Sequence, residues 1–64
     1  MQVKFLYGAT IFENDGSKTE IEEGQLLNVV RSFNDDGYYK VIAKLNGVDR
    51  EFIYDSDDMK LVEE

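Results

Sequence analysis

The stretch 22–41 constrains the fold of this chain more than any other, because it combines a glycine turn, an apolar strand and an acidic turn. After Gly24, apolar residues recur along Gln25–Ser32 in a way that is typical of a strand. Asn34–Gly37 consists of residues that favour tight turns, and Tyr38–Leu45 then alternates apolar and polar positions. We therefore expect a β-hairpin here, with the rest of the chain wrapped around it into a small barrel.

Alternation also predicts which side chains of this hairpin enter the core. In Gln25–Ser32, Leu27 and Val29 are expected to point inward. Leu26 and Val30 then lie on the opposite face, which we expect to be partly covered. The inward face of the second strand carries Tyr39, Val41, Ala43 and Leu45.

The segment before the hairpin begins with a second alternating stretch. Gln2–Tyr7 has a period of two, which predicts a half-buried strand. One face of that strand carries Val3, Phe5 and Tyr7. Gly8 permits a bend, after which Ala9–Phe12 is expected to continue the strand.

The segment after the hairpin contains the strongest turn signal in the chain. Asn46-Gly47 predicts a two-residue hairpin turn in which both residues have positive φ. Val48–Tyr54 then predicts a strand, Asp55–Asp58 a single tight or 3₁₀ turn, and Met59–Val62 a short closing strand. Since no stretch has a helical period, we expect an all-β fold: one domain, a barrel of five or six short strands.

Length and composition set limits on stability and location. A chain of 64 residues is one domain at most, and it contains no cysteine to form a disulfide or a thiolate metal site. Small secreted domains usually depend on disulfides, so a cytoplasmic location is expected. The first residues lack the apolar core of an export signal, and no apolar run is long enough to cross a membrane. A monomer is the default expectation.

Charge and residue types narrow the function classes. The net charge of −7 disfavours nucleic acid and anionic membranes as partners and favours a protein with a basic surface. No histidine is present, and each carboxylate pair falls at an expected turn; the pairs are Glu22/Glu23, Asp35/Asp36 and Asp57/Asp58. We therefore expect no enzymatic activity, no catalytic residue, no cofactor and no metal site.

The order of these motifs resembles a Src homology 3 domain over essentially the whole chain. The matching positions are Gly24, Leu27 and Val29, Asp36-Gly37, Tyr38-Tyr39-Lys40, Asn46-Gly47 and Met59–Val62. The resemblance implies a small barrel whose first, ligand-flanking loop corresponds to residues 13–23. In that family, Pro-rich peptides bind a groove of aromatic residues and a proline. Here Tyr7 is retained, Tyr38 replaces a tryptophan and Tyr54 falls near the proline position. Only some of the groove's usual residues are therefore present.

These residues give a predicted partner surface. Tyrosines 7, 38 and 54 form the aromatic part, and the acidic flank consists of Glu22, Glu23, Asp35 and Asp36. The alternative is that the tyrosines only cover a thin core. The leading function is a non-catalytic interaction module or accessory factor, of a bacterial or phage type. The second candidate is an acidic inhibitor that imitates nucleic acid and occupies the basic groove of an enzyme. Its carboxylates would be spaced like the phosphates of a duplex.

Overall fold

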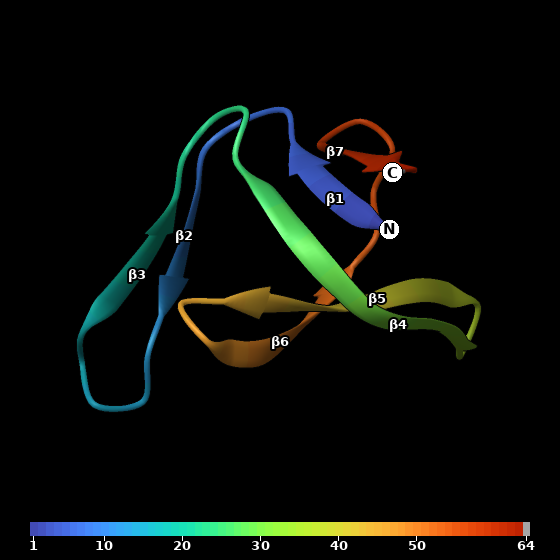
Figure 1. Cartoon of the computed structure of the whole chain (residues 1–64). Helices are drawn as coiled ribbons and strands as arrows, with labels where there is room; N and C mark the ends of the chain where they lie inside the picture. Colours follow the sequence, from blue (N-terminus) through green and yellow to red (C-terminus); the bar gives the residue numbers. More distant parts are fainter. Residues whose placement is uncertain (64) are drawn as a thin grey trace.

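The computed structural model describes residues 1–63, over which the chain forms seven β-strands and no helix (Figure 1). The strands are β1 (Gln2–Phe5), β2 (Ala9–Phe12), β3 (Lys18–Ile21), β4 (Leu26–Asp35), β5 (Tyr38–Leu45), β6 (Val48–Ile53) and β7 (Met59–Val62). The expected all-β fold is confirmed, as one small compact domain. Within residues 1–63 there is no helix long and apolar enough to cross a bilayer.

Five strands form the main sheet, in the order β6-β5-β4-β1-β7, and β2 pairs with β3 in a separate two-stranded sheet. All neighbouring strands are antiparallel. The long strand β4 pairs with β1 through residues 26–28 and with β5 from Val29 onward, and it has a bulge between Val29 and Arg31. A bulge bends a strand, and β4 thereby carries the sheet around the core in a barrel-like curve (Figure 1).

Both expected hairpin turns are confirmed. The turn between β4 and β5 has φ values of 51° at Asp36 and 82° at Gly37, and Asp35 pairs with Tyr38 directly before it. Between β5 and β6, the φ values are 54° at Asn46 and 79° at Gly47. Positive φ at both central residues is the backbone twist that matches two adjacent antiparallel strands.

This geometry predicts the effect of a substitution at Gly47. Gly47→Val is expected to lower the free energy of unfolding by about 1–3 kcal/mol, because a β-branched residue is strained at positive φ. Gly47→Asn is the control, since asparagine tolerates this backbone conformation. Thermal melts of the two variants make the comparison; equal melting temperatures would show that the left-handed conformation is not what the site requires.

The core consists of seven buried apolar side chains: Val3, Phe5, Ile21, Leu27, Val41, Ala43 and Leu45. The expected inward positions of β1, β4 and β5 are thus largely confirmed, with Val29 and Tyr39 half-buried at the margin. The Phe5 ring lies edge-on to Phe52 on β6, with the ring centroids 5.3 Å apart.

Three details differ from the sequence predictions. The first strand ends at Phe5, although the backbone N–H of Leu6 still donates to the Asp58 carbonyl in the register of the β1–β7 pair; Tyr7 lies in the bend that follows and is 63% exposed. β2 turns away from β1 and pairs with β3, so the chain has seven strands instead of five or six. Leu26 and Val30 are 46% and 52% exposed, so the expected partial cover of this side of β4 is wrong.

Candidate functional site

The three tyrosines of the predicted partner surface do not share one face. Tyr38 begins β5 on its outer face and is 56% exposed. Tyr54 is half-buried, and its ring meets Tyr39 edge-on at 5.8 Å between centroids. Its backbone N–H also donates to the Tyr39 carbonyl at 2.8 Å. Since side chains alternate along a strand, Tyr54 follows the inward face with Tyr39, on the opposite side from Tyr38.

The four acidic residues of that surface fall into two groups. Glu22 and Glu23 lie in the turn before β4, whereas Asp35 and Asp36 lie where β4 ends (Figure 1). β4 is ten residues long, which corresponds to about 30 Å of extended strand. The carboxylates therefore do not line a single rim.

Asp35 is also neutralised by a neighbour. The Lys40 Nζ lies 3.0 Å from the Asp35 carboxylate and 3.7 Å from that of Glu51. The hydrogen bond to Asp35, more than the charge of either carboxylate, raises the pKa of Lys40 above its ordinary value although desolvation opposes it. This contribution to stability is fully present at neutral pH and is lost only as the pH rises through that raised pKa.

Sequence analysis missed the most exposed aromatic residue. Phe12 ends β2 opposite Lys18 and is 77% exposed, while its neighbour Ile11 packs against the core. Alternation after Gly8 was the available signal, since an inward-pointing Ile11 places Phe12 outward. Tyr7, with 63% exposure, lies in the bend between β1 and β2.

The turn that follows Phe12 is ordered by its own side chains. The Asp15 carboxylate accepts hydrogen bonds from the Ser17 backbone N–H at 2.9 Å and from the Ser17 hydroxyl at 2.6 Å. The side-chain hydrogen bond from Ser17, followed by the backbone one, lowers the pKa of Asp15. Asp15 therefore keeps its negative charge at this turn throughout the neutral range.

An ion pair between residues far apart in the sequence joins the β2–β3 hairpin to the main sheet. The Arg50 guanidinium on β6 lies 2.7 Å from the Glu13 carboxylate, with the two side chains 32% and 20% exposed. Thr19 on β3 donates a further hydrogen bond to Glu13 at 3.4 Å. Together with the buried Ile21, this pair holds the β2–β3 hairpin in place. Residues 37 positions apart give no local signal, so the pair could not be found from sequence spacing.

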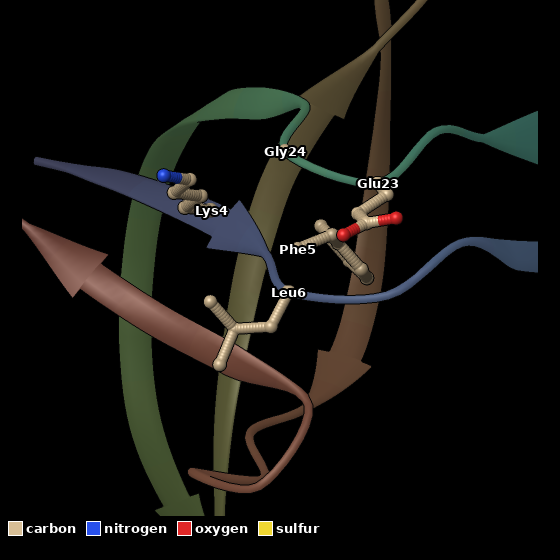
Figure 2. Close-up of a pocket in the computed structure, with 5 residues that line it drawn as sticks. All are labelled: Lys4, Phe5, Leu6, Glu23 and Gly24. Carbon is tan, nitrogen blue, oxygen red and sulfur yellow. The ribbon is translucent and has the colours of Figure 1, made fainter.

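A shallow pocket of about 360 Å³ lies between the turn that precedes β4 and the end of β1. It is lined by Lys4, Phe5, Leu6, Glu23 and Gly24 (Figure 2). Figure 2 shows the Lys4 ammonium and the Glu23 carboxylate on different sides of the apolar residues. The backbone here is already paired, since Gly24 donates to the Phe5 carbonyl at 2.7 Å. One cation, one carboxylate and an apolar floor suit the docking of a partner side chain.

Among residues 1–63, no cluster of three or more histidine, cysteine, aspartate or glutamate side chains is placed to hold a metal ion. Comparisons with protein-family models, curated proteins and solved structures found no match to this chain. The resemblance to a Src homology 3 domain therefore stays a prediction from the sequence motifs, and the structure shows a small all-β fold with antiparallel sheets.

Proposed function

We propose that this protein is a non-catalytic interaction module, similar to a Src homology 3 domain, that binds a protein with a basic surface. The binding surface is the segment 7–23, which we call the hairpin arm; it includes β2, β3 and the bends that join them to the main sheet. The likeness is supported by the position of residues 13–23 of this arm, which correspond to the first, ligand-flanking loop of the resembled family. The short turns that close β4–β5 and β5–β6 support it as well.

One observation carries the proposal: the hairpin arm combines exposed aromatic residues with excess negative charge. Phe12 and Tyr7, at 77% and 63%, are the two most exposed large apolar side chains of residues 1–63. The arm carries five carboxylates and one lysine, a net charge of −4 out of −7 for the chain. Leaving one phenylalanine in water forgoes about 1.5–3 kcal/mol of burial, a large loss for so small a domain.

The proposed surface revises the one predicted from the sequence. Tyr7, Glu22 and Glu23 remain in it, and Phe12 is added. Tyr54 is left out because its ring packs on Tyr39. Tyr38, Asp35 and Asp36 are left out because they lie at the far end of β4.

The distribution of charge supports an interaction module over an imitation of nucleic acid. Within residues 1–63, four carboxylates form ion pairs: Glu13, Asp35, Asp49 and Glu51. Many of the others lie in separate turns and bends, at residues 15, 22–23, 36 and 55–58. A regular line of unpaired carboxylates, as phosphate spacing would demand, is not the pattern that these positions suggest.

The test is selection of peptides on the immobilised protein from a random display library, followed by affinity measurements on the enriched peptides. We expect enriched peptides to combine lysine or arginine with apolar residues, and their affinity to fall with added salt. Phe12→Ser and Tyr7→Ser are each expected to weaken binding by about tenfold or more. Val48→Ser is the matched control, since Val48 is 52% exposed but lies on β6 outside the hairpin arm.

Two outcomes would contradict the proposal. One is enrichment of neutral or acidic peptides, which the charge of the hairpin arm should reject. The other is an equal loss of affinity in Val48→Ser and Phe12→Ser, which would place the binding surface elsewhere.

A further inference from the structure

A second exposed surface lies on the outer face of the second half of β4 together with β5 and β6. Alternation and register place four apolar side chains on it: Phe33, Tyr38, Ile42 and Ile53. Phe33 and Ile53 flank Lys40 from either side in a row across three strands. Tyr38 and Ile53 are 56% and 52% exposed, and Val30, the extra residue at the β4 bulge, is 52% exposed beside them. We call this surface the outer face.

The charges of the outer face cancel. Its cations are Arg31, Lys40 and Lys44, and its carboxylates are Asp35, Asp49 and Glu51. Lys40 bridges the carboxylates on β4 and β6, and Lys44 pairs with Asp49 at 2.8 Å. The Arg31 guanidinium lies over the Phe33 ring, 5.0 Å from its centroid. The net charge of −7 therefore falls on the rest of the chain, which holds four cations and eleven carboxylates.

We propose that two copies of this chain associate through their outer faces. Two molecules of charge −7 repel each other, and this neutral, half-apolar face is where they can approach at the lowest electrostatic cost. The layout is also self-complementary. Lysines run along β5 and acidic residues along β6, and a two-fold axis that runs between these strands would set the lysine row of each copy over the acidic row of the other, beside the ion pairs that each copy already makes.

The size of the outer face makes this a weak, reversible dimer. A stable interface buries about 800 Å² on each partner, whereas the whole chain exposes 4571 Å². Six residues of each of three strands cover only about 300 Å² in projection, from a strand spacing of about 4.8 Å and a rise of about 3.3 Å. We therefore expect a dissociation constant of about 10⁻⁴–10⁻³ M.

Sedimentation velocity on the purified chain over a range of concentrations tests the proposal. Association is expected to strengthen when NaCl rises from about 0.02 to 0.5 M, because salt screens the repulsion and leaves the apolar contact. Ile53→Lys is expected to weaken association about fivefold or more, and Tyr38→Lys is a second variant on the same face. Phe12→Lys is the matched control, because it also replaces an exposed apolar side chain with lysine but lies on the hairpin arm.

The control separates the effect of losing the apolar contact on the outer face from the effect of changing the net charge. All three variants bring the net charge from −7 to −6, so a change common to all of them reflects repulsion alone and overturns the assignment of the face. Sedimentation as a monomer at about 1 mM in high salt, where a dimer of this kind should be half formed, overturns the proposal itself. Partner binding by the hairpin arm is measured separately, so failure of one proposal leaves the other standing.

Discussion

Phe5→Ala is expected to lower the free energy of unfolding by about 3–5 kcal/mol, which is the usual cost of truncating a buried phenylalanine. Phe5 is only 3% exposed, and its ring packs edge-on against Phe52. It lies on β1, which is paired on both sides, with β4 and with β7. Since a core of this size supplies a net stability of about 3–5 kcal/mol, the variant should be largely unfolded at room temperature.

Circular dichroism with urea titration measures this effect, and Phe12→Ala is the matched control. The same substitution at a side chain that is 77% exposed is expected to change stability by about 0.5 kcal/mol or less. If Phe5→Ala melts like Phe12→Ala, the packing of β1 against β6 is not a main source of stability.

Tyr39→Ala is the second large effect, with an expected loss of about 2–3 kcal/mol. Tyr39 is half-buried, and the variant loses both its apolar contacts and the edge-on contact with Tyr54. Tyr38→Ala is expected to cost less than about 1 kcal/mol, because that side chain is 56% exposed. The two residues are adjacent and chemically identical, so the difference reports only which way each side chain points.

Thermal melts of both tyrosine variants settle the register of β5. A greater loss in Tyr38→Ala than in Tyr39→Ala would mean that the inward and outward faces of β5 are exchanged. The outer face proposed for self-association would then be the core face, and that proposal would fail with it.

Local chemistry explains what could be predicted from the sequence. Asp36-Gly37 and Asn46-Gly47 favour two-residue turns by themselves, and alternation along β5 then fixes which side chains are buried. These signals predicted the hairpins and most of the core. They are short-range, because a turn and a period of two depend only on neighbouring residues.

What could not be predicted depends on pairing between distant segments. The bend at residues 6–7 ends β1 and places Tyr7 outside the core, and it lies where the chain leaves the pairing with β7, far away in the sequence. The ion pair between Glu13 and Arg50 likewise joins separate parts of the sequence. Phe12 was missed for a different reason. Alternation with Ile11 indicates which way its side chain points, but only the structure shows that no other segment covers it and that it is 77% exposed.

The pairing of β1 with β7, the first and last strands, has a consequence for folding kinetics. The hairpins β4–β5 and β5–β6 close over two-residue turns, and such hairpins form within about 1–10 μs. Pairing Phe5 with Met59 instead requires closure of a long loop. The chain loses conformational entropy on this closure before the contact between the strands can stabilise it. We therefore expect β7 to join the sheet after the main barrier, so that substitutions there speed unfolding and leave the folding rate almost unchanged.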